Sequence, residues 1–214
     1  MSVKDQHLDT LEDIRRMMKR SSRFISLSGL SGIAAGLWAL IGAYFALSWI
    51  GDYRNNYNGQ AYDNPDFHSL KWNLLLLALG ILVLSVISAF YFTWRKAGRD
   101  RLPFWDHTTK MLMLNMAIPL VAGAVFILAM LQYNEWRFVA PACLIFYGLS
   151  LVNGSKYTLS EIRYLGIFEI VLGLVCTQFI GYGVYFWAVG FGLLHIIYGF
   201  AMWRKYEVNR VVEV

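Results

Sequence analysis

Charged side chains are scarce in this chain. Asp, Glu, Lys and Arg make up only 15% of the 214 residues, while 57% are hydrophobic. A soluble domain carries about 25% charged residues. A surface so short of charge must face something other than water, which excludes an ordinary water-soluble domain.

Residues that carry enzyme or cofactor chemistry are also scarce. The 2 cysteines, Cys143 and Cys176, and the 4 histidines show no metal-ligand spacing. Only His195 lies within an apolar run, whereas haem ligation by paired histidines needs two. No phosphate- or dinucleotide-binding glycine loop is present. We therefore expect no enzymatic activity, no catalytic residue, no metal and no cofactor.

Long apolar runs dominate what is present. A helix that crosses a bilayer needs about 20 apolar residues, and stretches such as LLLLALGILVLSVISAF lack the alternation of a β-barrel strand. The predicted spans are residues 24–49, 70–94, 109–131, 136–153, 161–180 and 184–203. The sequence predicts an all-α fold, a bundle of about six transmembrane helices in a polytopic protein whose main partner is the lipid bilayer.

The positive charges predict an orientation. If the N-terminus is cytoplasmic, only Arg54, Lys71 and Arg137 of the 19 Lys and Arg residues lie outside, leaving 16 inside. Such an excess on the cytoplasmic side is the usual arrangement in membrane proteins. We therefore predict an inner-membrane protein with both termini in the cytoplasm. The net charge of +5 reflects this topology, and we expect no nucleic-acid partner.

The two ends of the chain lie outside these spans. In residues 1–23 the stretch LDTLEDIRRMMKR has an apolar stripe, with acids before bases as suits a helix dipole. It is either an amphipathic helix that touches lipid headgroups or a cytoplasmic protein through residues 5–20, or a solvated extension of the first span. Residues 204–214 are predicted to form a cytoplasmic tail.

One acid interrupts an apolar run. Glu169 lies within LGIFEIVLGL, on the same helical face as Gly166 and Gly173. His195 has the same relation to Gly192 and Gly199. Small residues let helices approach closely in lipid, so both faces are predicted packing surfaces.

A turn at residues 180–184, IGYGV, would fold the fifth span back on the sixth. Antiparallel packing about this turn predicts three facing pairs, which are Gly166 with Gly199, Gly173 with Gly192, and Glu169 with His195. The first span repeats the glycine spacing and is predicted to join this interface through Gly29, Gly32 and Gly36. Polar residues that could share the Glu169 layer are Ser28, Ser31, Asn115, Asn153 and Tyr198.

Two functions stay open for the Glu169–His195 pair. A buried hydrogen bond that fixes helix packing suits a non-enzymatic membrane sensor, scaffold or regulatory partner. A pair that handles protons or cations suits a small transporter or channel subunit, because ionisable residues within spans are functional candidates. We favour the first, because a single ionisable pair is weak evidence for a path along which a proton or cation crosses the membrane. The sequence leaves the oligomeric state open.

The stretch IRRMMKRSSRFISLSGLSGIAAGLWALIGAY resembles the start of an uncharacterised group of bacterial multi-pass membrane proteins, of the kind found in Bacteroidetes. The resemblance covers chiefly the N-terminal segment and the first span. It implies placement in the inner membrane and carries no assigned activity.

Overall fold

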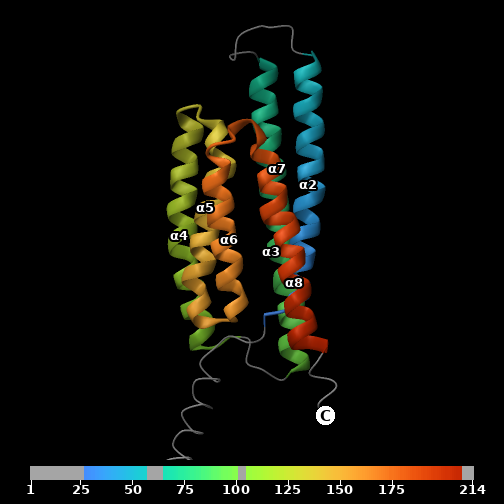
Figure 1. The fold of residues 1–214 in the computed structure, drawn as a ribbon, viewed down its shortest axis with the longest axis vertical. Coiled ribbons are helices and arrows are strands. Elements are labelled where there is room, and N and C mark those ends of the chain that lie inside the picture. The colour runs from blue at the N-terminus through green and yellow to red at the C-terminus, as the bar shows by residue number, and fades with distance from the viewer. Residues whose placement is uncertain (1–26, 57–64, 101–104, 209–214) are drawn as a thin grey trace, which may run out of the picture.

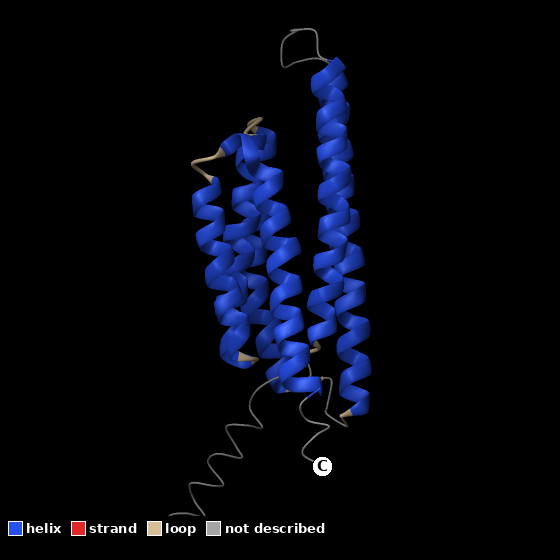
Figure 2. Ribbon diagram, turned by 45° about the vertical axis from the view of Figure 1, so that its right-hand side comes forward, coloured by secondary structure: helices blue, strands red, loops and turns tan. Residues whose placement is uncertain are grey.

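The structure is a computed structural model that describes residues 27–56, 65–100 and 105–208. Within these ranges the chain is helical and contains no strand (Figure 2). The long helices are α2 (Gly29–Asn56), α3 (Pro65–Arg99), α4 (His107–Gln132), α5 (Val139–Gly154) and α6 (Ser160–Cys176). The predicted amphipathic helix at 1–23, with its partner segment 5–20, lies outside the described residues.

The last part of the described chain is a continuous helical rod with changing geometry. It comprises α7 (Gly183–Trp187), the π-helical turn η4 (Ala188–Leu194), α8 (His195–Trp203) and a second π-helical turn, η5 (Arg204–Val208). The rod therefore does not stop at residue 203, where the sixth span was expected to end. Short 3₁₀ turns connect the neighbouring helices, namely η1 (Trp136–Phe138), η2 (Ser155–Tyr157) and η3 (Ile180–Tyr182).

The helices run up and down one long axis, with α2 and α3 reaching furthest at the top of Figure 1. We call this end, where α2 ends and α3 begins, the upper end. The opposite end, where α2 begins and the rod ends, is the lower end. At the lower end α4 begins with a side-chain cap, because the Asp106 carboxylate accepts a hydrogen bond from the Thr109 backbone N–H at 2.7 Å.

Length and composition make these helices candidate membrane spans. Five helical segments of the described chain are long and apolar enough to cross a bilayer. The remaining one, α6, has 17 residues, at the short end of the range of about 17–25 that a span requires. The fold class predicted from the sequence is confirmed: the chain is an all-α helical bundle of the membrane-protein type.

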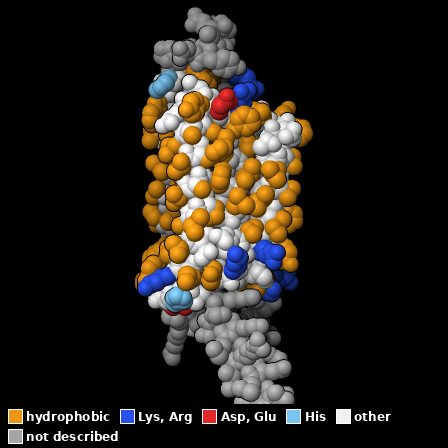
Figure 3. Space-filling view, turned by 90° about the vertical axis from the view of Figure 1, so that its left-hand side faces the viewer, with side chains coloured by type: hydrophobic (Ala, Val, Ile, Leu, Met, Phe, Trp, Pro, Cys, Tyr) orange, Lys and Arg blue, Asp and Glu red, His pale blue; other side chains and the backbone are white. Residues whose placement is uncertain are grey.

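The outer surface of the bundle is apolar over its middle. Figure 3 shows hydrophobic side chains covering the central part of one face, with Lys and Arg side chains gathered toward the two ends. On α3, Leu76 and Leu82 are 60% and 59% exposed. Contact with lipid tails suits such an apolar surface, whereas contact with water would be unfavourable.

The helices form two closely packed pairs, each with one further helix beside it. In the first pair α8 and η4 lie along α2, and α3 packs on the same α2. In the second pair α6 lies along α5, and α4 packs on the same α5. We call these the α2–α8 pair and the α5–α6 pair. Contact between α6 and the rod is sparse by comparison. Near the lower end, however, Met202 of α8 joins the buried apolar cluster of α5 and α6 that includes Leu151 and Leu165.

Candidate functional site

Glu169 lies near the middle of α6 and is fully buried, with 0% of its surface exposed. Its carboxylate fits there because the facing residue of η4 has no side chain. A Cβ atom on Gly190 would stand 2.6 Å from Glu169 Oε2 and 2.5 Å from Leu144 Cδ2. A larger residue at position 190 would therefore push the ends of the Glu169 and Leu144 side chains aside.

His195 of α8 lies against the same acid. Its Nδ1 atom is 3.4 Å from Glu169 Oε1. Because the backbone carbonyl of Gly190 can only accept, the 3.0 Å contact between Nδ1 and Gly190 O assigns the ring proton to Nδ1. In the neutral ring, Nε2 is then an acceptor, and the Tyr147 hydroxyl of α5 donates to it at 2.8 Å. We call Glu169, His195, Tyr147 and the Gly190 carbonyl the Glu169 cluster.

The π-helical turn η4 places the Gly190 carbonyl within this cluster. In a π-helical turn the backbone hydrogen bonds connect residues five apart, whereas in an α-helix they connect residues four apart. Such turns occur frequently at functional sites. His195 follows Gly190 by five residues, and its ring nitrogen takes a hydrogen-bond position on that carbonyl. The widened turn thus links the helix backbone to the His195 side chain.

The Glu169 carboxylate remains without a hydrogen bond. Within the described residues, neither Oε1 nor Oε2 has a hydrogen-bond partner, although both atoms are buried. A buried polar group left in this way costs about 1–3 kcal/mol, and more if it is charged. His195 Nδ1 consequently has two acceptors within reach, the Gly190 carbonyl and the Glu169 carboxylate.

The glycines of α6 face α5. A Cβ on Gly166 would stand 2.7 Å from the carbonyl oxygen of Gly148, and one on Gly173 would stand 2.7 Å from Ile145 Cγ1. The approach is mutual, since a Cβ on Gly148 would lie 2.6 Å from Gly166 O. These contacts make the α5–α6 pair a backbone-to-backbone interface.

The glycines of the rod face α2. A Cβ on Gly36 would lie 2.6 Å from Gly192 O, and one on Gly199 would lie 2.7 Å from Gly29 O. One on Gly32 would lie 3.1 Å from the Cα of Gly199. The α2–α8 pair is therefore closed in the same way as the α5–α6 pair.

The predicted pairing of Gly166 with Gly199 and of Gly173 with Gly192 is wrong, because each glycine face is occupied by a different neighbour. The structure nevertheless brings Glu169 and His195 together. All the predicted packing glycines lie at close helix contacts, and the glycine face of the first span does meet the last span.

Ser28, which directly precedes α2, and Ser31, in the first turn of α2, lie in another cluster at the lower end. The Ser28 hydroxyl donates to Glu207 Oε1 at 2.9 Å, and the backbone N–H of Gly29 donates to the same oxygen at 2.8 Å. Ser31 donates to the backbone carbonyl of Ser28 at 2.5 Å. Their predicted place in the Glu169 layer is wrong, because at the start of α2 Ser28 is bonded to Glu207 of the continued rod and Ser31 is bonded to Ser28.

The two asparagines also lie away from Glu169. Asn153 donates to the backbone carbonyl of Asn115 at 2.8 Å, which joins the lower parts of α5 and α4. The predicted placement of both in the Glu169 layer is therefore wrong. Tyr198 lies about one turn below His195 on α8, with its ring 6.3 Å from that of Phe168 on α6.

Sequence reasoning missed three members of these clusters. Tyr147 had a usable signal, since a tyrosine in the middle of an apolar span needs a partner for its hydroxyl. Glu207 lies beyond the last apolar run and was assigned to the tail. Gly190 is one of several glycines in that run, and only the π-helical turn distinguishes it.

The described residues contain no group of three or more His, Cys, Asp or Glu side chains that could hold a metal ion. No protein-family model, curated protein or solved structure matches the chain.

Proposed function

We propose that this chain is a non-enzymatic inner-membrane sensor or regulatory partner, and that the Glu169 cluster is its proton-responsive switch. One observation carries the proposal. A fully buried carboxylate without a hydrogen bond lies 3.4 Å from a histidine nitrogen, at the contact between the α5–α6 pair and the α2–α8 pair. Placing an acidic side chain within a membrane costs free energy, so such residues are candidates for a functional role.

The two acceptors of His195 provide the switch. When Glu169 carries a proton it is neutral, and Nδ1 keeps its hydrogen bond to the Gly190 carbonyl at 3.0 Å. When Glu169 loses that proton, its charge lies in an apolar layer and needs a partner. The Nδ1–H group then turns to the carboxylate and releases the carbonyl of η4.

The consequence is a change in how α8 is held. Tyr147 of α5 holds Nε2 of the His195 ring in both states. Nδ1 is bonded to the backbone of the rod in the first state and to Glu169 of α6 in the second. Because contact between α6 and the rod is otherwise sparse, a small gain in free energy at this point shifts the two pairs relative to each other. Residues 5–20 would pass that shift to a cytoplasmic protein, or the bundle surface would pass it to a second copy of the chain.

A small transporter or channel subunit is the second candidate. The unpaired oxygens of Glu169 favour it, since they are suitable ligands for a proton or a cation. The packing favours the sensor, because Glu169 and its neighbour Leu144 are both 0% exposed and a translocated ion needs a path.

Hydrogen exchange of residues 188–195 in nanodiscs tests the switch. We expect protection of this segment to change between about pH 5 and about pH 9 in the unmodified chain. The change should disappear in Glu169→Gln, which keeps the shape but cannot ionise. The matched control is Glu135→Gln at the upper end, whose side chain is 42% exposed; it should respond like the unmodified chain.

An unchanged pH response in Glu169→Gln would overturn the switch. The same preparations in proteoliposomes separate the two candidates. Proton or cation uptake that disappears in Glu169→Gln and persists in Glu135→Gln would establish the transporter or channel reading.

The orientation is tested separately. We propose that the chain crosses the inner membrane six times with both termini in the cytoplasm, as the positive charges and the bacterial resemblance favour. A reporter fused after residue 60 should then read as outside, and one fused after residue 214 as inside. An outside reading at residue 214 would require an odd number of crossings.

A further inference from the structure

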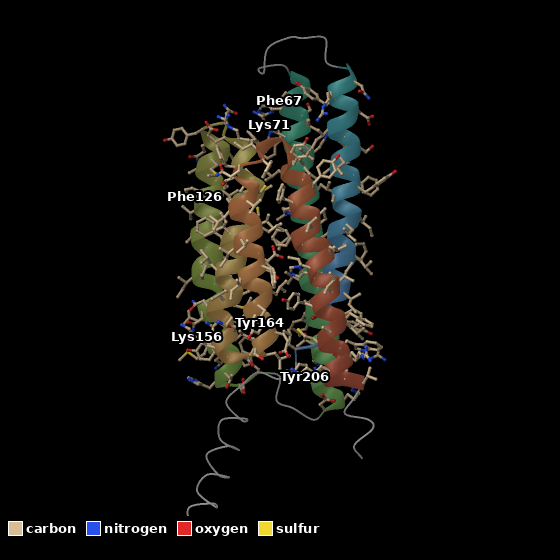
Figure 4. The ribbon with its side chains drawn as sticks, viewed as in Figure 1. Phe67, Lys71, Phe126, Lys156, Tyr164 and Tyr206 are labelled. Atoms are coloured by element: carbon tan, nitrogen blue, oxygen red, sulfur yellow. The ribbon has the colours of Figure 1, made fainter. Side chains whose placement is uncertain are left out.

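A pocket of about 480 Å³ opens at the upper end of the bundle, far from the Glu169 cluster. It lies between the upper parts of α2 and α3 and the turns η1 and η3. Three aromatic residues line it, namely Tyr53, Phe67 and Trp136. Figure 4 shows Phe67 and Lys71 close together near the upper end of α3.

The charged side chains among the described lining residues of this pocket are all of one sign. Arg54, Lys71 and Arg137 line it, and none of the described lining residues is Asp or Glu. These are the same residues that the charge distribution assigns to the outer side, so every Lys and Arg of the upper end in the described chain meets here. The pocket therefore matches an anion.

The three bases differ in how they are held. Lys71 Nζ donates to Asn134 Oδ1 at 2.8 Å and lies 4.4 Å from the Phe67 ring centre and 5.2 Å from that of Trp136. Arg137 is paired with Glu135 at 2.9 Å, and its side chain is 58% exposed. Lys71 is thus positioned by the pocket walls, while the two arginines stand at the surface.

The remaining lining is apolar. Ile50, Leu70, Leu74 and Ile180 extend the pocket toward the part of the bundle that faces lipid tails. A ligand that fits must carry an anionic group at one end and hydrocarbon at the other. Positive and aromatic side chains at a membrane edge suit such a molecule.

We propose that this pocket binds the phosphate-bearing headgroup of an anionic phospholipid from the leaflet at the upper end, with an acyl chain along the apolar lining. Arg54, Lys71 and Arg137 neutralise the phosphate, since charge-assisted hydrogen bonds to phosphate are strong. The aromatic rings enclose the glycerol region. This site is independent of the Glu169 switch.

Native mass spectrometry and thermal unfolding of the full chain in a neutral detergent test the site. Phosphatidylglycerol should bind and raise the melting temperature, whereas phosphatidylcholine should not. The variant Arg54→Gln/Lys71→Gln/Arg137→Gln should lower the affinity for phosphatidylglycerol by about tenfold or more. Lys110→Gln, an exposed base at the lower end, is the matched control and should retain full affinity.

Arg54→Gln/Arg137→Gln provides a second test if the triple variant is too unstable, because it keeps the Lys71 contacts. It should also weaken phosphatidylglycerol binding. Equal binding by the unmodified chain and by this double variant would overturn the proposal. Inorganic phosphate alone that stabilises the chain as strongly as the lipid does would also overturn it, in favour of a soluble anion.

Discussion

The α2–α8 and α5–α6 interfaces differ in kind from the contact between the two pairs. Within each pair, glycines bring backbone against backbone, so that an added Cβ on Gly36 or Gly148 would lie 2.6 Å from a carbonyl oxygen. Between the pairs, side chains such as Glu169, His195 and Tyr147 make the contact. Tight packing leaves one arrangement, whereas side chains with alternative partners allow more than one.

The same contrast continues at the lower end. Lys205 and Tyr206 of η5 both donate to the carboxylate of Glu161, at the start of α6. Hydrogen bonds to this carboxylate depend on side chains that are partly open to water. The two pairs are therefore closely packed units, joined to each other by polar side chains and by the apolar cluster around Met202.

The largest effect is expected from filling a glycine interface. Gly36→Leu forces α2 from the rod, because its Cβ alone would stand 2.6 Å from both Gly192 O and Ile196 Cγ1. Overpacking costs about 1–3 kcal/mol and occasionally more, and we expect the upper part of this range. Thermal unfolding in one detergent measures the loss.

Gly80→Leu is the matched control, since nothing lies within 4 Å of a Cβ at Gly80 on α3. Leucine is the better helix former by up to about 1 kcal/mol, so this variant should be unchanged or slightly more stable. Equal losses in Gly36→Leu and Gly80→Leu would remove the distinction between tight and lipid-facing surfaces.

A smaller effect is expected at the contact between the pairs. His195→Leu should lower the free energy of unfolding by about 1–3 kcal/mol, because it leaves the buried Tyr147 hydroxyl and Glu169 carboxylate without their neighbour. Glu169→Leu should cost less, because His195 keeps its contacts with the Gly190 carbonyl and Tyr147. The double variant should lose less than the sum, with a coupling of about 0.5–3 kcal/mol. Strict additivity in a double-mutant cycle would show that the two side chains do not interact.

The smallest effect is expected from Tyr147→Phe. It removes one hydroxyl, whose hydrogen bond to His195 Nε2 is 2.8 Å long, and should cost about 0.5–1.5 kcal/mol. Tyr44→Phe is the control, because Tyr44 is 71% exposed on α2, and its melting temperature should not change. If Tyr147→Phe lowered the free energy of unfolding as much as Gly36→Leu does, the polar contact between the pairs would be as sensitive to substitution as the glycine interfaces within them.

The sequence was sufficient for the helices and for the meeting of Glu169 with His195. Apolar run lengths determine where spans lie, and the turn near residue 181 determines which residues of α6 and α8 share a level. The sequence does not identify which neighbouring helix each glycine face contacts. In a bundle of several helices a packing face can meet any neighbour, and the period of 3.6 residues identifies only the face.

Helix geometry explains why Glu169 and the glycines of α6 contact different helices. At about 100° per residue, Glu169 is turned about 60° from Gly166 and about 40° from Gly173 around α6. The glycines can therefore contact α5 while the acid, at the edge of their face, reaches α8. The π-helical turn that sets Gly190 against the acid lies beyond sequence reasoning, because no residue pattern marks where a helix widens.

Glu207 has a consequence for the order in which the protein can be completed. Its carboxylate caps the first described helix by accepting from the Gly29 backbone N–H at 2.8 Å, although the two residues are 178 positions apart. The buried Lys96 Nζ lies 3.8 Å from the same carboxylate. During synthesis α2 and α3 enter the membrane long before Glu207 leaves the ribosome. Until then the start of α2 lacks this cap, and Lys96 Nζ, which also donates to the Leu27 carbonyl at 2.7 Å, lacks its carboxylate partner. We therefore expect docking of the end of the rod to be a late step in completing the bundle.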